Sequence, residues 1–265
     1  MTKNQTALDS SKIVKMDTYR QDGAQSLYRA ISIIKTVAQY EKTGARMSMI
    51  ARKLDLPSST VHRILSVLVS EDFIEYDQAT KKYHLGYGLY VLGENAHKFD
   101  ISEKYYSALK NVSEKTGETS YLLVRSGNDA LCLDRIVGSY PIQVLTFEIG
   151  ARRPLGIGAG SLAILSALPD DISNAIIAAN AEEYRGFVGR TAEDVHKAIK
   201  KTRQDGYAQS NKVVNAETIG VGMVINDQKG KVLGAISAAG ILSRMKPDRR
   251  RTIVEIIRSE IENAG

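Results

Sequence analysis

The segment that most limits what this chain can fold into is residues 56–68, LPSSTVHRILSVL. At 3.6 residues per turn its apolar side chains share one stripe with the spacing i, i+3, i+4 and i+7, namely Val61, Ile64, Leu65 and Leu68. The opposite face carries short hydroxyls, an imidazole and a guanidinium, with no acidic residue before Glu71: Ser58, Ser59, Thr60, His62, Arg63 and Ser66. A solvated helix face usually mixes Glu with Lys, so this face is suited instead to lie against DNA.

The flanking segments predict a scaffold for this helix. Residues 49–56 read as a short helix that ends before Pro57, because proline disfavours helical geometry at the residue before it. Residues 25–41 form a third amphipathic stretch, closed by Thr43 and Gly44. Downstream, residues 72–76 and 81–85 are β-prone and predict a hairpin with Lys81 and Lys82 near its tip.

Three helices and a basic hairpin predict a winged helix-turn-helix over residues 25–86. In that arrangement the second helix of the motif enters the major groove and the wing reaches phosphates or the minor groove. The predicted DNA contacts are Ser58, Ser59, Thr60, His62, Arg63, Lys81 and Lys82. The alternative is an ordinary helical hairpin within a larger domain.

Length and charge favour two domains. With 265 residues, the chain has room for a DNA-binding unit and a second domain with a full core. Lys and Arg outnumber Asp and Glu by 14 to 10 over residues 1–99 and by 22 to 20 over the rest, so the excess positive charge lies mostly with the predicted DNA-binding unit. The lone cysteine, Cys132, excludes a disulfide within the chain and fits a reducing compartment.

Further composition arguments predict a cytoplasmic protein without a membrane partner. Residues 1–24 are polar, lack the apolar run of a signal peptide and are expected to be a disordered tail, and no later stretch is long and apolar enough to span a bilayer. No cofactor is expected. The four histidines have no metal-type spacing with one another or with Cys132, so no metal site is expected either.

A second fold is expected from residue 100, after a linker helix over residues 87–99; the segment 86–99 holds three glycines, so the helix is weak by itself. Strands are predicted at 119–125, 130–137, 142–147, 218–226 and 231–239, and helices at 100–116, 158–168, 171–179, 191–205 and from Pro247 onward. This pattern predicts an α+β domain, residues 100–265, built on a largely antiparallel sheet.

A glycine-rich loop, residues 152–160, runs straight into an apolar helix. Small residues there leave backbone N–H groups free at the helix start, where the dipole favours the carboxylate or carbonyl of a small ligand. The loop is not a P-loop, because no Lys-Ser/Thr follows at the required spacing. The alternative is that the glycines only permit tight turning and packing. Arg152 and Arg153 could attract an anion, or lie in a solvated loop or an interface.

As a whole, residues 25–263 resemble the IclR family of bacterial transcriptional regulators. The resemblance rests on motifs in the family's order: residues 56–65, Arg153-Pro154-Leu155 before Gly158-Ala159-Gly160, 205–208, 219–223 and 234–240. It implies an N-terminal winged helix-turn-helix, a linker helix and a C-terminal GAF-like domain that binds a small effector. It also implies a homodimer or a dimer of dimers on double-stranded DNA with a palindromic operator.

The resemblance also implies an effector site. In members that bind small oxo-acids, the ligand is held by backbone N–H groups at the positions of Gly158 and Ala159 and by an Asp, a Cys and two Ser. Here those four positions are Ser210, Gly220, Ser237 and Ala239, so one of the four side chains is retained. We therefore expect a less polar and roomier pocket, and a carboxylate larger than glyoxylate or pyruvate.

The full set of expected effector-binding residues is Gly158, Ala159, Gly160, Ser161, Ser210, Gly220, Ser237, Ala239 and Cys132. Cys132 lies in an alternating strand and is either a small core residue or part of the ligand site. The sequence thus favours a regulator whose operator affinity responds to a small molecule. The alternative is an enzyme acting on a small acid with a DNA-binding anchor, although no Ser-His-Asp arrangement or nucleophile elbow is visible.

Overall fold

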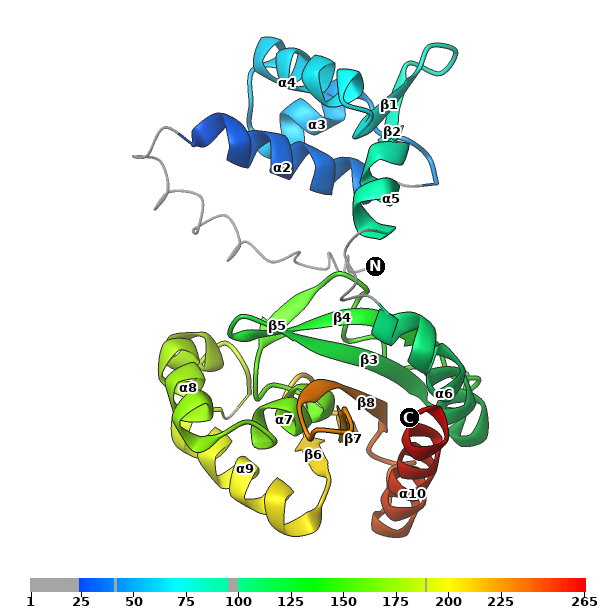
Figure 1. The fold of residues 1–265 in the computed structure, drawn as a ribbon, viewed down its shortest axis with the longest axis vertical. Helices are drawn as coiled ribbons and strands as arrows, with labels where there is room; N and C mark the ends of the chain where they lie inside the picture. The colour runs from blue at the N-terminus through cyan, green and yellow to red at the C-terminus, as the bar shows by residue number, and fades with distance from the viewer. Residues whose placement is uncertain (1–23, 41, 95–99, 189) are drawn as a thin grey trace, which may run out of the picture. The chain divides into compact units, whose positions relative to one another are not determined.

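The computed structural model describes residues 24–40, 42–94, 100–188 and 190–265. The chain divides into two compact units, Met1–His97 and Lys98–Gly265, which we describe separately (Figure 1). The tail predicted over residues 1–24 lies outside the described residues, except for Ala24. Within the described residues, no helix is both long and apolar enough to cross a membrane.

The first unit has the predicted three helices, α2 (Gln25–Ala38), α3 (Met47–Leu54) and α4 (Ser58–Ser70) (Figure 1). Asp55 adopts the left-handed conformation, with φ of 52°, and closes α3 so that the chain turns into α4 after Pro57. The stripe predicted on α4 is buried in the core of this unit with side chains of α2, α3, the loop between them and the first strand of the wing: Ile33, Val37, Ala45, Ile50, Ala51, Val61, Ile64, Leu65, Leu68 and Ile74. Burial of this stripe stabilises the helix-turn-helix.

The wing is an antiparallel hairpin of β1 (Ile74–Asp77) and β2 (Lys82–Leu85). Its turn is closed by Asp77, whose carboxylate accepts hydrogen bonds from the backbone N–H groups of Ala79, at 2.8 Å, and Thr80, at 3.2 Å, and from the Thr80 hydroxyl. The hydrogen bonds from Thr80 lower the pKa of Asp77. Helix α5 (Tyr87–Glu94) follows; the rest of the linker helix expected over residues 87–99 lies outside the described residues.

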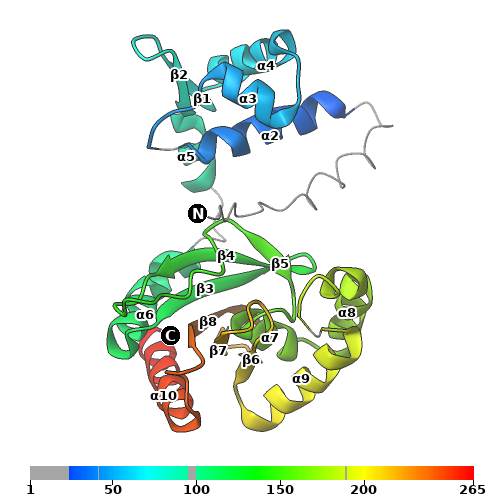
Figure 2. The same ribbon diagram turned by 180° about the vertical axis from the view of Figure 1, so that it is seen from behind.

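The second unit is built on a six-stranded sheet in the order β5-β4-β3-β8-β7-β6, in which every neighbouring pair is antiparallel (Figures 1 and 2). Its strands are β3 (Thr119–Ser126), β4 (Asp129–Ile136), β5 (Arg152–Pro154), β6 (Ala208–Asn211), β7 (Thr218–Asn226) and β8 (Val232–Ile241). The structure therefore has the expected α+β class with an antiparallel sheet, and it adds β5 and β6, which the sequence pattern did not predict.

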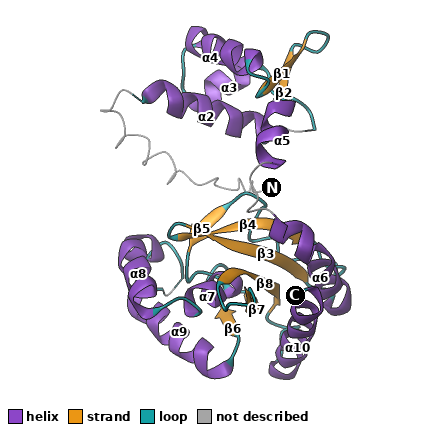
Figure 3. Cartoon of the chain, viewed as in Figure 1, coloured by secondary structure: helices purple, strands orange, loops and turns teal. Residues whose placement is uncertain are grey.

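Helices cover both faces of this sheet (Figure 3). Side chains alternate along β3, so that Leu122 packs with α6 (Asp100–Thr116) and α10 (Pro247–Ala264). Its neighbours Tyr121 and Leu123 pack on the other side with α7 (Ala159–Ser166), α8 (Asp170–Tyr184) and α9 (Ala192–Asp205). This period of two is what a strand buried on both faces requires.

The strand predicted at residues 142–147 is absent; this prediction was wrong. The segment, here called the strap, is irregular, because residues 150–154 already occupy the edge of β4 beside Asp129–Cys132. Its carbonyls accept hydrogen bonds from side chains instead: Ile142 from Arg244 at 2.8 Å, Val144 from Tyr121, Thr146 from Arg153 at 2.5 Å and Phe147 from Arg135 at 3.2 Å. Side chains thus satisfy backbone groups that would otherwise need a sheet.

Candidate DNA interface and ligand pocket

The polar face of α4 is open to solvent. Ser58, Ser59, His62 and Arg63 are exposed and Thr60 is partly exposed, while the apolar stripe of the helix is turned inward. Within the described residues, neither His62 nor Arg63 makes a side-chain hydrogen bond or ion pair, so both remain available to a ligand. This geometry meets one requirement of a recognition helix, which must present a free polar face to base edges.

A groove lies between the start of α3, α4 and the wing. His62, Ser66 and Lys81 line it together with Arg46 and Tyr76, whereas Arg63 is exposed on α4 outside it. Lys82 is placed differently from its neighbour, because its Nζ donates to the Thr43 carbonyl at 2.6 Å. The structure thus brings α4 and Lys81 to one groove and ties Lys82 back to the loop after α2.

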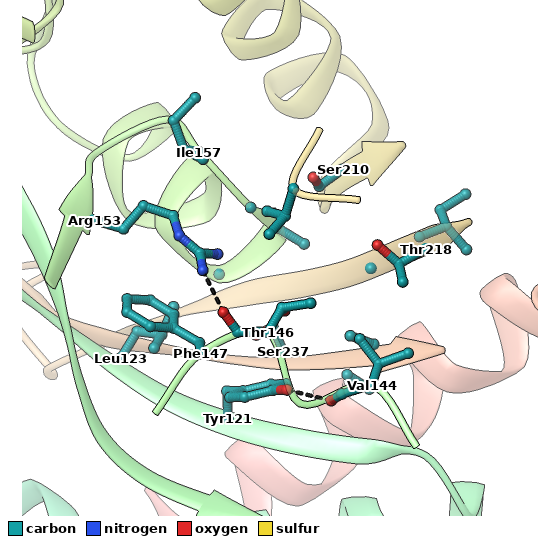
Figure 4. A pocket seen from close by; sticks show the side chains of 18 residues that line it. Tyr121, Leu123, Val144, Thr146, Phe147, Arg153, Ile157, Ser210, Thr218 and Ser237 are labelled. Atoms are coloured by element: carbon teal, nitrogen blue, oxygen red, sulfur yellow. Dashed lines mark hydrogen bonds between the residues drawn. The ribbon is translucent and has the colours of Figure 1, made fainter. Parts of the chain in front are cut away.

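A pocket lies in the second unit, between α7, the strap and strands β3, β7 and β8 (Figure 4). Its free volume is about 50 Å³. Seven of the nine predicted effector residues line it: Gly158, Ala159, Gly160, Ser210, Gly220, Ser237 and Ala239. The tertiary structure thus collects residues that are up to 81 positions apart in the chain around one cavity.

The start of α7 faces this pocket. Gly158 has a φ of +92°, which glycine adopts without strain, and no side chain caps the helix. A Cβ on Gly160 would lie 2.9 Å from the Ser237 hydroxyl oxygen, so glycine allows the helix start and that hydroxyl to approach. The unsatisfied N–H groups of a helix start and its dipole favour an anion here.

Two serine hydroxyls line the same pocket (Figure 4). Ser210 is 7 % exposed and Ser237 is 6 % exposed. In the part of the chain that the structure describes, neither hydroxyl has a hydrogen-bond partner. Both hydroxyls are therefore free to bond to a molecule or water in the pocket.

Arg153 projects from β5 into the pocket (Figure 4). Its Nη2 donates to the Thr146 carbonyl of the strap at 2.5 Å, and its guanidinium carbon lies 4.3 Å from the centre of the Phe147 ring. Burial lowers the pKa of Arg153 to about 10, and the side chain therefore stays charged at neutral pH. The pocket thus has a positive group beside apolar walls.

The lining is largely apolar, as the replacements at Gly220 and Ala239 predict, but the cavity is small. The sequence pattern did not indicate nine further residues that line the cavity: Tyr121, Leu123, Val144, Thr146, Phe147, Ile157, Val214, Thr218 and Ile219. Val144, Thr146 and Phe147 belong to the strap, which the sequence pattern predicts as a strand. No feature of the sequence indicates that this segment lies against α7. The expected roominess is therefore not seen at a volume of about 50 Å³.

The other two predicted effector residues have structural partners. The Ser161 hydroxyl is fully buried, accepts from the backbone N–H of Gly156 at 2.9 Å and lies 3.2 Å from the Pro154 carbonyl, which it donates to. Cys132 is fully buried in the core, and its Sγ lies 3.4 Å from the Asp134 carbonyl. Neither residue lines the pocket. Burial raises the pKa of the Cys132 thiol to about 12.

Metal ligation has no support among the described residues, in which no group of three or more His, Cys, Asp or Glu side chains is placed to hold a metal ion. The polar groups of the pocket are instead hydroxyls, backbone N–H groups and a guanidinium. Such groups bind organic anions rather than metals.

Two family models match the chain: the C-terminal region of the bacterial transcriptional regulator IclR over residues 93–263, and the IclR helix-turn-helix domain over residues 26–78. Similar curated proteins include the HTH-type transcriptional repressor AllR of Klebsiella pneumoniae, which is 28% identical over 249 residues, with 92% of this chain and 89% of that protein covered. The same repressor of Escherichia coli K12 is 28% identical over 244 residues, with coverages of 90% and 88%.

Similar solved structures include an IclR homologue of Microbacterium hydrocarbonoxydans in complex with 4-hydroxybenzoate, with a TM-score of 0.75 at 21% identity and coverages of 90% and 97%. The IclR protein of Thermotoga maritima has a TM-score of 0.72 at 20% identity, with coverages of 90% and 96%. These two likenesses show the fold. Since the two family models together span both units, the chain belongs to the IclR family of bacterial transcriptional regulators, and it binds DNA through its helix-turn-helix domain.

Proposed function

We propose that this protein is a cytoplasmic repressor whose affinity for its operator changes when a small carboxylate occupies the pocket of the second unit. The observation that carries the DNA-binding part is the exposed polar face of α4, on which Arg63 and His62 are free within the described residues. Sequence-specific reading requires such groups at base edges, and Arg63 can donate two hydrogen bonds to a guanine. The repressor sign is supported by the similar AllR proteins.

The ligand part rests on the pocket. An uncapped helix start, two serine hydroxyls that are free within the described residues and a guanidinium line it, and all of them favour a carboxylate. The complex of the similar Microbacterium protein with 4-hydroxybenzoate supports an acid larger than glyoxylate or pyruvate. The cavity of about 50 Å³ would have to widen for such an acid, and the strap, which no sheet holds, is the wall that would move.

We also propose a homodimer or a dimer of dimers on a palindromic operator. Support comes from apolar side chains that stay exposed on two helices of the first unit. On α2, Leu27 and Ile31 lie one turn apart, and on α5 Tyr87 is 82% exposed beside Tyr90. A second copy of the chain would bury these side chains, and a two-fold axis would then match a palindrome.

The test is a fluorescence-anisotropy titration with DNA from the intergenic region upstream of the protein's own gene, with random DNA as competitor and carboxylates added one at a time. Binding that resists the competitor and changes with one acid is the expected result. Binding that random DNA abolishes would contradict the proposal. Turnover of the acid by the purified protein would favour an enzyme with a DNA-binding anchor, a function that no observation of the pocket favours.

A further inference from the structure

We propose that Arg153 determines ligand specificity: its guanidinium forms an ion pair with the ligand's carboxylate, so the pocket accepts organic monoanions and rejects their neutral isosteres. This inference rests on the proposed function, because it requires that the pocket bind a small molecule. It goes further in naming the residue that reads the charge of that molecule. It also sets the ligand's orientation, with the acid at the start of α7.

The position of Arg153 supports this role. Its Nη1 lies 3.6 Å from the point that a Cβ on Gly158 would occupy, so the guanidinium stands beside the first residues of α7. A carboxylate in the pocket beside Gly158 would have the guanidinium on one side and the N–H groups of the helix start on the other. The Ser237 hydroxyl, near Gly160, would be a further donor. Three kinds of hydrogen-bond donor thus line one pocket.

The charge of Arg153 is not balanced by the protein within the described residues. No carboxylate there pairs with it; its contacts are the Thr146 carbonyl and the ring of Phe147. A partly buried charge without an opposite charge is costly, and an anionic ligand would offset that cost. A neutral ligand of the same shape would not offset the cost, and the guanidinium would stay without an opposite charge.

The Arg153 guanidinium also has N–H donors that its hydrogen bond to Thr146 does not use. Of its five N–H donors, one is directed to Thr146, so a planar pair remains for a carboxylate. Lysine would keep the charge but lose the planar pair. The residue type therefore matters as well as its charge.

The neighbouring arginine supplies a matched control. Arg152 precedes Arg153 on β5 but points the other way; it is exposed, and its Nη1 donates to the Ser126 hydroxyl at 2.6 Å. Alternation along a strand explains why two consecutive arginines have separate surroundings. Replacing either one removes the same charge from the chain, and only Arg153 lines the pocket.

The experiment is isothermal titration of the full-length protein with 4-hydroxybenzoate and its neutral isostere 4-hydroxybenzamide. The expected result is that the acid binds the wild type and Arg152→Met alike, and that the amide binds roughly 10- to 100-fold more weakly, as for the loss of a hydrogen bond to a charged group. Arg153→Met should lose affinity for the acid by a similar factor. Arg153→Lys should fall between them.

Two results would separate this inference from the proposed function. Equal binding of acid and amide by the wild type, or of acid by Arg153→Met and wild type, would overturn the role of Arg153 and leave the ligand pocket standing. If neither 4-hydroxybenzoate nor a series of smaller and larger carboxylates binds the wild type, the carboxylate pocket is refuted and this inference with it. Thermal unfolding without ligand checks that Arg153→Met is folded, so that a loss of affinity for the acid is not a loss of the fold.

Discussion

Arg244 and Glu118 form a two-point ion pair in which the Arg244 Nε donates to Oε1 at 2.9 Å and its Nη2 to Oε2 at 2.8 Å. Glu118 is 1% exposed, and Arg244 also donates to the carbonyl of Ile142, the first residue of the strap. The guanidinium carbon lies 4.2 Å from the centre of the Tyr140 ring. One side chain thus joins the ends of β3 and β8 to the segment that covers the pocket.

Arg244→Met should therefore destabilise the second unit by about 3 kcal/mol, because it removes both arginine hydrogen bonds of a buried carboxylate and leaves it only the Arg249 Nη2, at 3.9 Å. Urea unfolding followed by circular dichroism measures the change. Arg251→Met is the matched control: its ion pair with Asp248, at 3.7 Å, is exposed, so the expected change is within about 0.5 kcal/mol. Equal losses of stability in the two variants would show that the buried ion pair of Glu118 stabilises the protein no more than the exposed one does.

Replacements on α4 and the wing should separate base reading from phosphate binding. Arg63→Ala should cost about 1–3 kcal/mol on the operator and much less on random DNA, whereas Lys81→Ala should weaken both and reduce the slope of log affinity against log salt by about 1. Anisotropy titrations at several salt concentrations measure both effects. Lys229→Ala, in the turn between β7 and β8, is the control and should change neither. Equal losses on both DNAs with Arg63→Ala would refute its base-reading role.

Substitutions at two residues that are register partners on β7 and β8 should change the width of the pocket. Gly220 and Ala239 are register partners, and both line the cavity. A Cβ on Gly220 would lie 3.3 Å from the Ala159 Cβ, so Gly220→Ala should narrow the pocket and weaken ligand binding, while Ala239→Gly should spare it. Calorimetric titration with 4-hydroxybenzoate measures the difference. Equal affinities in both variants would place the ligand elsewhere.

Cys132 should be inert in the folded protein and reactive when unfolded. Burial raises the pKa of its thiol from the ordinary 9.0 to about 12, so at about pH 8 alkylation by iodoacetamide should require urea. The folded state also keeps this proton above pH 9, where the unfolded thiol loses it. Stability should therefore fall as pH rises from about 9 toward 12, by up to about 1.4 kcal/mol per pH unit for this group. Cys132→Ala should show a flatter profile; alkylation of the native protein at the unfolded rate would contradict the burial.

The exposed side chain of Tyr87 gives a test of self-association. If α5 packs against a second copy, Tyr87→Glu should shift the protein toward the monomer, which light scattering after size-exclusion chromatography detects. Val188→Glu changes another exposed apolar residue, 63% exposed and outside α5, and should leave the oligomer intact. An unchanged molar mass with Tyr87→Glu would exclude α5 from the interface.

Elements whose partners lie close in sequence, or whose pattern is strongly periodic, were predictable. The α4 stripe of Val61, Ile64, Leu65 and Leu68 is buried as its spacing requires, and β7 begins and ends at residues 218 and 226 as predicted. The alternation on β7 and the turn after it specify that hairpin locally. The motif at Gly158–Gly160 also indicated the start of α7, where these residues line the pocket.

Other features depended on which edges and cavities the tertiary structure left free. Residues 142–147 are a run of mostly β-prone residues after Pro141, but residues 150–154 pair with the nearby edge of β4, and arginines and Tyr121 bind their carbonyls instead. Likewise, two consecutive arginines look alike in the sequence, and only β5 directs Arg153 into the pocket and Arg152 to the surface. Local periodicity therefore determined the helices and the main strands. The pairing of residues 150–154 with the edge of β4 is a contact between residues distant in the sequence. It decided that the strap is irregular and that a positive charge lines the pocket.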